Sequence, residues 1–103
     1  MIRHLVHLRF RGDVTDDTKQ ALYDRLAGLS GHIDGIEDFQ HRRNVSVETP
    51  LVRDFRDMFW FDFRDVEVRD RYLADREHEA IGGDIVAHLE GGPEGVFVCD
   101  IEL

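Results

Sequence analysis

The sequence is poor in several features, and each deficit excludes a class of protein. It holds a single cysteine, Cys99, so no disulfide can form within the chain. Cys99 lies in the apolar run Val-Phe-Val-Cys, where we expect a buried, unreactive thiol. No stretch approaches the ~20 consecutive apolar residues of a membrane helix, and the first residues lack a signal-peptide pattern. We therefore expect a soluble, cytoplasmic protein with no membrane partner.

Positive charge is also scarce. Lys and Arg number 13 against 22 Asp and Glu, which gives a formal net charge of −9, and Lys19 is the only lysine. A surface of this sign repels phosphate groups, so nucleic acid is disfavoured as a partner.

The alternation of apolar residues predicts four strands. The chain of 103 residues suits one domain, residues 1–103, with one core. Residues 2–10 and 55–63 alternate clearly, residues 36–47 alternate weakly, and residues 96–103 form a last apolar stretch. Phe55, Asp57, Phe59, Phe61 and Phe63 share one side of the third strand, which we expect to be buried.

Helical patterns separate these strands. Asp13 or Thr15 can cap a first helix, which carries leucines at helical spacing. Asp65 caps a short helix to about residue 73, and a further helical segment runs from about His78 to residue 89. Thr49-Pro50 marks a turn or loop. The order β-α-β-β-α-β predicts an α+β, ferredoxin-like fold: a four-stranded antiparallel sheet with helices on one face.

The second face of this sheet is expected to be apolar as well. It would carry Leu5, His7, Met58 and Trp60, together with one side of the last strand. A face that holds Met58 and Trp60 is too apolar to remain in contact with water. We therefore expect the face to pack against its counterpart in a second copy, which would form a two-fold homodimer.

Tyr72 and His78 are the most compact candidates for chemistry. A phenol and an imidazole six residues apart, at the end of a short helix, can share a pocket and transfer protons near neutral pH. His4 and Asp57 are each the only polar residue on an apolar strand face. A buried carboxylate is costly unless it is paired, so we expect His4 and Asp57 to pair across neighbouring strands. The expected pocket walls are Phe55, Phe59, Phe61, Phe63, Val6 and Leu8.

Each candidate also has a purely structural explanation. A His4–Asp57 pair can simply satisfy itself, Tyr72 can pack with its hydroxyl tied to the backbone, and His78 can be an exposed residue at a helix start. A metal site is poorly supported, because the sequence has neither paired cysteines nor a His-Glu-x-x-His motif. His32, His41 and His88 lie in polar surroundings typical of the surface. We expect no metal and no cofactor.

The chain resembles the stress-responsive A/B barrel domains, or dimeric α+β barrel proteins, over nearly its whole length. The resemblance rests on short segments in a fixed order: Ile-Arg-His-Leu-Val-His-Leu-Arg-Phe-Arg at residues 2–11, Gly35-Ile36, Asn44-Val45-Ser46, Phe-Asp-Phe-Arg-Asp-Val-Glu at 61–67, Tyr72-Leu73, His78 and Val98-Cys99-Asp100. It implies a ferredoxin-like protomer and a homodimer whose sheets face each other. It implies no single activity, since members include plant stress proteins, uncharacterised bacterial proteins and a plant polyketide cyclase, olivetolic acid cyclase.

The distant similarity to that cyclase implies roles for individual residues. The tyrosine and histidine that catalyse an aldol condensation there fall on Tyr72 and His78, and a first-strand pocket histidine falls on His4. A further pocket histidine falls on Asp57, which is a departure from the cyclase. The similarity implies a cofactor-independent cyclase or lyase in which His78 is the general base or acid, Tyr72 binds a substrate oxygen, and His4 and Asp57 orient the groups.

The resemblance leaves two functions open. An enzyme of this kind would take a small aromatic or polyketide-like ligand into the pocket between sheet and helices. The alternative is a non-catalytic stress-responsive protein, whose role is a stable oligomer or ligand binding. An open cavity bounded by the four candidate residues favours the first function, and a filled core favours the second.

Overall fold

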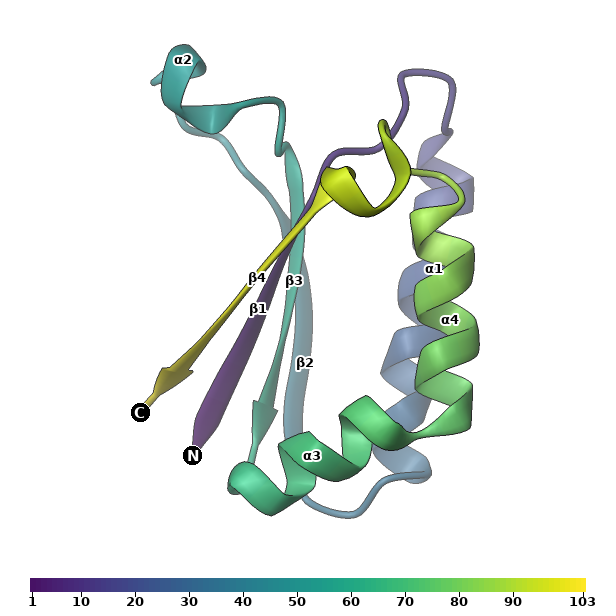
Figure 1. Cartoon of the computed structure of the whole chain (residues 1–103), viewed down its shortest axis with the longest axis vertical. Coiled ribbons are helices and arrows are strands. Elements are labelled where there is room, and N and C mark those ends of the chain that lie inside the picture. The colour runs from purple at the N-terminus through teal and green to yellow at the C-terminus, as the bar shows by residue number, and fades with distance from the viewer.

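The computed structural model describes residues 1–103 as one antiparallel sheet with helices on one face. The strands β1 (Ile2–Leu8) and β3 (Asp57–Phe63) form the centre, in the order β2-β3-β1-β4, and β2 (Ile36–Arg43) and β4 (Val96–Glu102) form the edges. The helices α1 (Asp16–Ala27) and α4 (Arg76–Val86) cover the same face, and α3 (Val66–Ala74) lies across its end (Figure 1). This is the ferredoxin-like fold that the element order predicted.

Short elements connect these parts. The 3-10 turns are η1 (Gly28–Gly31) and η2 (Gly92–Gly95), and α2 (Thr49–Val52) is a single helical turn where the sequence predicted only a turn or loop. Thr15, one of the two predicted caps, accepts the N–H of Thr18 at 3.1 Å, and Asp65 accepts the N–H of Val68 at 3.0 Å. No helix is long and apolar enough to cross a membrane.

All four strands are shorter than predicted: β1 ends two residues early at Leu8, and β4 ends one residue early at Glu102. Side chains and backbone turns limit the other two strands. The extended chain of β2 stops at Arg43, since the side chain of Asn44 bonds the carbonyl of Phe55 and the N–H of Ser46. β3 begins only at Asp57, because Arg53 and Asp54 have left-handed φ values of 54° and 63°. Such values are incompatible with a β-strand.

Phe55 consequently does not lie on the side that alternation predicted. It lines a depression on the opposite face of the sheet, together with His7 and Phe97. The guanidinium of Arg9 lies over its ring, with Cζ 5.0 Å from the ring centroid. The prediction that Phe55 lines a pocket between sheet and helices is therefore wrong, because the left-handed turn breaks the alternation before β3 starts.

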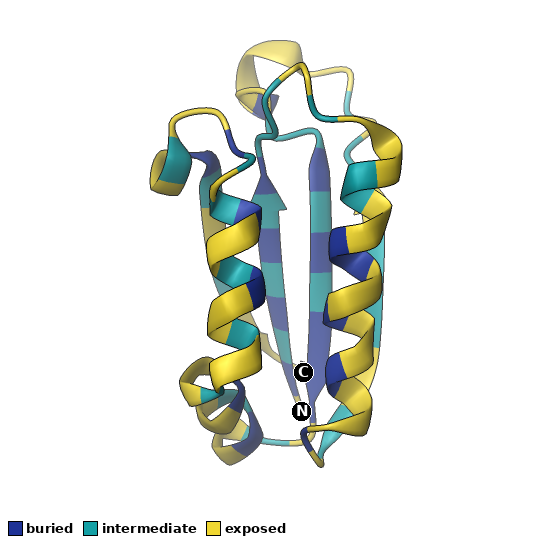
Figure 2. Cartoon of the chain, turned by 90° about the vertical axis from the view of Figure 1, so that its right-hand side faces the viewer, coloured by how far each residue is buried: buried dark blue, intermediate teal, exposed yellow.

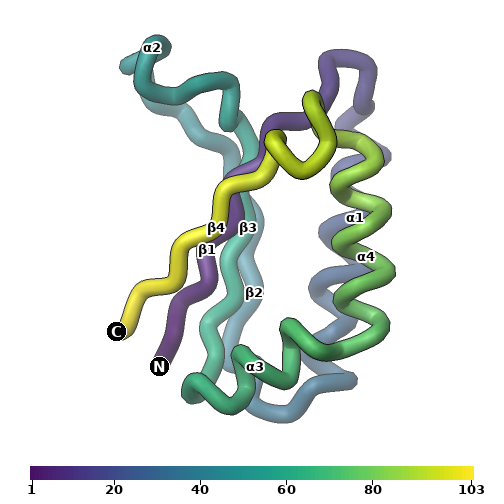
Figure 3. Tube along the Cα trace, viewed as in Figure 1, coloured from purple at the N-terminus to yellow at the C-terminus, as the bar shows by residue number.

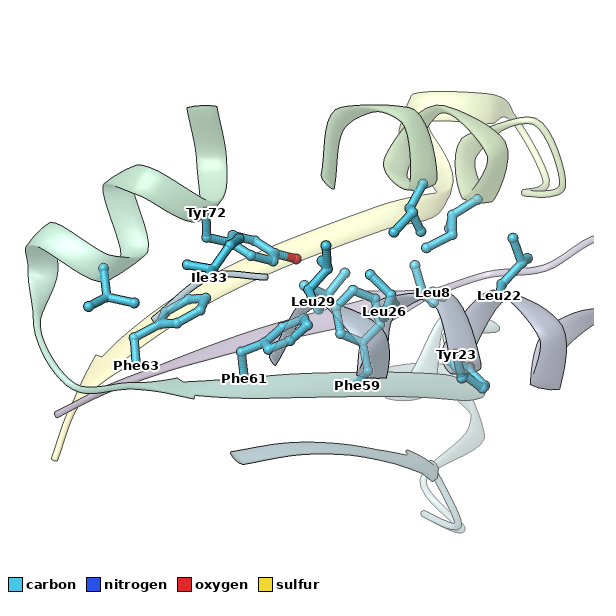
Figure 4. Close-up of a cluster of buried hydrophobic side chains, with 14 of the residues drawn as sticks. Leu8, Leu22, Tyr23, Leu26, Leu29, Ile33, Phe59, Phe61, Phe63 and Tyr72 are labelled. Atoms are coloured by element: carbon cyan, nitrogen blue, oxygen red, sulfur yellow. The ribbon is translucent and has the colours of Figure 1, made fainter. Parts of the chain in front are cut away.

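The core lies between the sheet and the helices and is centred on the aromatic side chains of β3. Phe59, Phe61 and Phe63 are at most 4% exposed. Tyr72 of α3 packs on this row, with ring centroids 4.8 Å from Phe61 and 5.0 Å from Phe63 (Figure 4). Figure 2 shows that α1 and α4 turn their buried residues toward the sheet, with Leu22 and Leu26 among those of α1. Full burial of each phenylalanine contributes roughly 1.5–3 kcal/mol, so this row stabilises the fold together with the other residues of the 16-residue core.

The second face of the sheet has no helix of its own chain across its middle (Figure 3). Leu5, His7, Met58 and Trp60 point to it and are only partly buried, and Phe97 is 56% exposed. Arg3 and Asp62 form a two-bond ion pair on this face, at 2.8 and 3.0 Å. The apolar second face was thus predicted from alternation.

Cys99 also lies on this second face, because it stands opposite Leu5 in the β1–β4 register. Its side chain is partly exposed in the single chain. The expectation of a buried thiol is therefore wrong for the single chain, since β4 is an edge strand and only one of its faces meets the helices.

Candidate active site

Asp75 positions the two candidate catalytic residues, because it ends α3 and caps α4. Its backbone N–H donates to the carbonyl of Tyr72 at 3.2 Å, and its carboxylate accepts the N–H of His78 at 3.0 Å. Its ψ of 133° interrupts the helical path. Tyr72 and His78 therefore lie on two helices that meet at Asp75, which agrees with the two helical segments predicted to end near residue 73 and to begin near His78.

Asp75 is itself held in place by the loop after η1. Its second carboxylate oxygen lies 2.6 Å from Nε2 of His32. The hydrogen bond from the backbone of His78, reinforced by His32, holds the pKa of Asp75 below its usual value. Asp75 is therefore ionised at neutral pH, and the junction of α3 and α4 is fixed.

The rings of Tyr72 and His78 are in direct contact, with centroids 3.9 Å apart and planes at 36°. Tyr72 is 1% exposed, whereas His78 is partly exposed and its buried Nδ1 has no hydrogen-bond partner. Burial, aided by nearby His4, lowers the pKa of His78 against the opposing effect of Asp75 and Glu79. The imidazole is therefore neutral at pH 7 and can accept a proton.

Burial shifts the pKa of Tyr72 in the opposite direction to that of His78. It raises the pKa of the phenol, and the negative charge of Asp100 raises it further. Tyr72 therefore stays protonated at any physiological pH and can donate a hydrogen bond to a bound oxygen atom. The two rings in contact thus combine a proton acceptor with a hydrogen-bond donor.

The side chain of His4, which projects from β1, also lies beside Tyr72. It is 4% exposed, and its ring meets that of Tyr72 edge-on at 5.4 Å. Nδ1 of His4 lies 2.6 Å from one carboxylate oxygen of Asp100, and Arg69 donates to the other at 3.1 Å. A carboxylate at this nitrogen favours a hydrogen on Nδ1, which leaves Nε2 as an acceptor.

Asp57 is not the partner of His4, so the predicted pair is wrong. In the β1–β3 register His4 stands opposite Phe61 and Asp57 stands opposite Leu8, near the other end of the strands. Asp57 instead accepts a hydrogen bond from Lys19 of α1 at 3.0 Å, and both side chains are largely buried. Alternation identified the face of Asp57 correctly but not its position along that face.

A cavity of about 270 Å³, partly open to solvent, brings Tyr72, His78 and His4 together. Its volume is close to the lower end of the range of small-molecule sites. Apolar side chains make up most of the wall: Val6, Leu8, Phe59, Leu73, Ile85, Val86, Val96 and Val98.

The cavity includes only some of the predicted lining residues. Val6, Leu8 and Phe59 line it, and Asp57 does not. Phe61 and Phe63 also lie outside it, because they are fully buried beneath the ring of Tyr72. These two side chains support the phenol and do not contact the cavity.

Sequence reasoning missed Asp100, Arg69 and Asp75. A signal for Asp100 was present, because Val96, Val98 and Asp100 alternate and place its carboxylate on the helix-covered face. Finding its partner also requires that β4 pair with β1, which puts Asp100 opposite His4. No sequence signal identified the pairing of Arg69 with Asp100.

The potential metal ligands in the sequence are not gathered. No group of three His, Cys, Asp or Glu side chains is placed to hold a metal ion. His88 bonds the carbonyl of Asp84 at 2.7 Å. His41 stacks on Tyr23 at 4.3 Å, and His32 pairs with Asp75, so these two have tertiary contacts that the prediction of surface residues overlooked.

Comparison with known proteins identifies the family. The model of the stress responsive A/B barrel domain matches residues 2–103. The chain belongs to this family. Among curated proteins, no sequence matches this A/B barrel domain significantly.

Solved structures resemble this A/B barrel domain over nearly its whole length. A dimeric ferredoxin-like protein of unknown function from Jannaschia sp. CCS1 is 28% identical, with a TM-score of 0.88, and the match covers 99% of this chain and 98% of that one. The protein At3g17210 of Arabidopsis thaliana is 21% identical, with a TM-score of 0.88 and coverage of 100% and 95%. A hydroxynitrile lyase from Passiflora edulis is 10% identical, with a TM-score of 0.78 and coverage of 99% and 92%. At 21% and 10% identity the likeness shows the fold alone.

Proposed function

We propose that this A/B barrel domain is a cofactor-independent acid–base enzyme that forms or breaks a carbon–carbon bond in a small carbonyl or hydroxyl compound. The contact between the neutral ring of His78 and the protonated ring of Tyr72, inside a mostly apolar cavity, is the observation that carries this proposal. Acid–base chemistry at a carbon atom requires one group that accepts a proton and another that stays protonated at the same pH. His78 and Tyr72 meet this requirement, because their pKa values are shifted in opposite directions.

In the bond-forming direction, His78 takes a proton from a carbon that lies between two carbonyl groups. The Tyr72 hydroxyl donates a hydrogen bond to the enolate oxygen that results. The enolate carbon then attacks a second carbonyl carbon of the same linear chain, and the alkoxide formed receives the proton held by His78. The polyketide cyclase to which this chain is distantly similar catalyses an aldol condensation of this kind.

In the bond-breaking direction the same groups act in reverse. His78 takes the hydroxyl proton, the carbon–carbon bond breaks as the carbonyl forms, and the leaving carbon anion receives the proton. Tyr72 donates to the oxygen throughout. The Passiflora edulis enzyme of the same fold is named for such a cleavage of hydroxynitriles, which supports this class of reaction.

We further infer that two copies associate through the second face of the sheet. That face presents Leu5, His7, Met58 and Trp60 beside the exposed ring of Phe97. Similar solved structures are described as dimeric. The same face supports the second candidate function, a stress-responsive protein whose role is a stable oligomer or ligand binding without turnover.

The test of catalysis uses two probe substrates: a linear poly-β-keto thioester and an aromatic hydroxynitrile. We expect turnover of one of them by the unmodified protein. His78→Ala should lower kcat/KM by about 10²–10⁴, as expected for loss of a general base. Tyr72→Phe should lower it by about 10²–10³, as expected for loss of an oxyanion donor.

His88→Ala is the matched control, because His88 lies near the end of α4 and does not line the cavity. Its kcat/KM should equal that of the unmodified protein. Full activity in a well-folded His78→Ala variant contradicts the proposal. Binding of the probes without turnover by the unmodified protein favours the non-catalytic candidate function.

A further inference from the structure

A second cavity, which we call the basic cavity, lies at the end of the sheet away from α3. It has a volume of about 580 Å³ and forms where β1 and β2 end and β3 begins. Five basic residues line it: Arg9, Arg11, Lys19, Arg43 and Arg56. None of its lining residues belongs to the cavity of Tyr72 and His78.

The charge of the basic cavity is opposite to that of the molecule. Its five basic residues face three acidic ones, Asp54, Asp57 and Glu90, which leaves a formal charge of +2 in a chain of −9. Acidic residues outnumber basic ones by 22 to 13, so a guanidinium has many potential carboxylate partners. Cations that converge without such partners therefore require an explanation.

Three of these arginines have no ion-pair partner. Arg9, Arg43 and Arg56 take part in none of the ion pairs of the structure. Their charges therefore remain available to a ligand. Lys19 is neutralised by Asp57, and Arg11 pairs with the exposed carboxylate of Asp13 at 3.3 Å.

Two of the unpaired guanidinium groups are nevertheless held in place. Arg9 lies over the ring of Phe55 and donates to the carbonyl of Glu94 at 3.2 Å, and its Nε is buried with no hydrogen-bond partner. Arg56 donates to the carbonyl of Ser46 at 3.3 Å. Cationic groups that are already ordered lose little entropy when they bind an anion.

We propose that the basic cavity binds a small dianion, namely a phosphate or dicarboxylate group, at a site separate from the acid–base cavity. With Lys19 and Arg11 already paired, the three unpaired arginines outnumber the two unpaired acidic residues of the cavity, Asp54 and Glu90, so the cavity keeps a net positive charge for an anion. Arginine presents several N–H donors in one plane and binds phosphate or carboxylate oxygens through paired hydrogen bonds. The unpaired Arg9, Arg43 and Arg56 supply these donors.

The test is a titration followed by the backbone amide shifts of the full chain, with inorganic phosphate and with succinate as separate probes. Chloride keeps the ionic strength constant. We expect saturable shifts at residues 9–12, 43–44 and 54–57. Arg43→Gln and Arg9→Gln should each weaken binding about tenfold, as expected for loss of a charge-assisted contact.

Arg76→Gln is the matched control, because Arg76 is an exposed arginine at the start of α4 with no ion pair of its own. It should leave the affinity unchanged. Arg43 has no side-chain contact that the fold requires, so its variant tests the site even if Arg9→Gln destabilises the chain. Saturation by phosphate assigns a phosphoryl ligand, and saturation by succinate alone assigns a dicarboxylate.

Three results would overturn the proposal. One is the absence of saturable shifts with both probes. Another is a set of shifts centred away from the basic cavity. The last is an equal loss of affinity in Arg43→Gln and in the Arg76→Gln control, which would indicate a general effect of net charge.

Discussion

At the scale of the residue, burial gives Tyr72 and His78 complementary protonation states. Burial disfavours the charged form of any group, so it lowers the pKa of an imidazole and raises that of a phenol. Here it acts on two rings only 3.9 Å apart. The pair therefore keeps a free base and an intact hydroxyl over a wide pH range without a metal or a charged partner.

This state predicts the pH profile of the acid–base reaction. Because the pKa of His78 lies below its usual 6.5, kcat/KM should rise with pH through a midpoint below pH 6.5 and level off below about pH 7.5. Because the pKa of Tyr72 lies above its usual 10.0, no decline should follow up to about pH 10. Initial rates measured as a function of pH check both the rise at low pH and the absence of a decline at high pH. A plateau reached only above pH 7.5, or a loss of rate near pH 9, would contradict the assigned roles.

The ion-pair partners of Asp57 and His4 show how far sequence reasoning reaches at this scale. A lone carboxylate on an apolar strand face correctly indicated that Asp57 is buried and has a partner. Its partner is Lys19, on a helix far from it in the sequence, and the partner of His4 is Asp100 on another strand. Residue type predicts that a buried charge needs a partner, and only the register and helix packing determine which residue it is.

At the scale of the element, the two glycines of α4 have different roles. Gly82 lines the cavity of Tyr72 and His78, and Gly83 is exposed and does not. A Cβ atom at either position would meet no atom within 4 Å. Gly82 therefore keeps the cavity larger than alanine would, although glycine makes the helix less stable. No contact in the structure explains why residue 83 is also a glycine.

Alanine at each glycine separates these effects. Gly82→Ala and Gly83→Ala should each raise the free energy of unfolding by about 0.5–1 kcal/mol, because alanine is the better helix former. Only Gly82→Ala should raise the KM of the acid–base reaction, since its methyl group extends into the cavity. Denaturant unfolding and initial-rate kinetics measure the two quantities. An equal change of KM in both variants would show that Gly82 does not shape the binding space.

The elements themselves were largely predictable, and their ends were not. Local periodicity predicted α1, α3, α4 and the four strands, because apolar faces repeat with the period of each element. The start of β3 depended on the left-handed backbone of Arg53 and Asp54, and the start of α4 depended on Asp75. Asp75 is a residue type common at helix starts. The left-handed conformation of Arg53 is not indicated by its residue type, so Phe55 was placed on the wrong face.

At the scale of the whole molecule, the sheet separates two surfaces with different roles. The helix-covered face holds the core and the cavity, whereas the second face is apolar and lacks a cover in the single chain. A stable interface buries on the order of 800 Å² per partner and has an apolar centre. The second face has the composition of such a centre.

The proposed homodimer predicts the effect of a charge placed on this face. Met58→Glu should convert a dimer into a monomer at micromolar concentration, because the interface would bury an unpaired carboxylate. Val66→Glu is the control, since Val66 is 44% exposed at the start of α3, where an acidic residue is tolerated. Size-exclusion chromatography with light scattering gives the masses. A monomeric unmodified protein would refute the dimer.

The sequence by itself determined the element order, the ferredoxin-like fold, the apolar second face and the residue types capable of acid–base chemistry. These features follow from local periodicity and from the chemistry of single side chains. The tertiary structure alone decided that Asp100, not Asp57, holds His4, that Asp75 brings the rings of Tyr72 and His78 into contact, and that five basic residues line one cavity of an acidic protein. Strand order, register and turn conformation determine these contacts between residues distant in sequence, and periodicity along the chain carries no information about them.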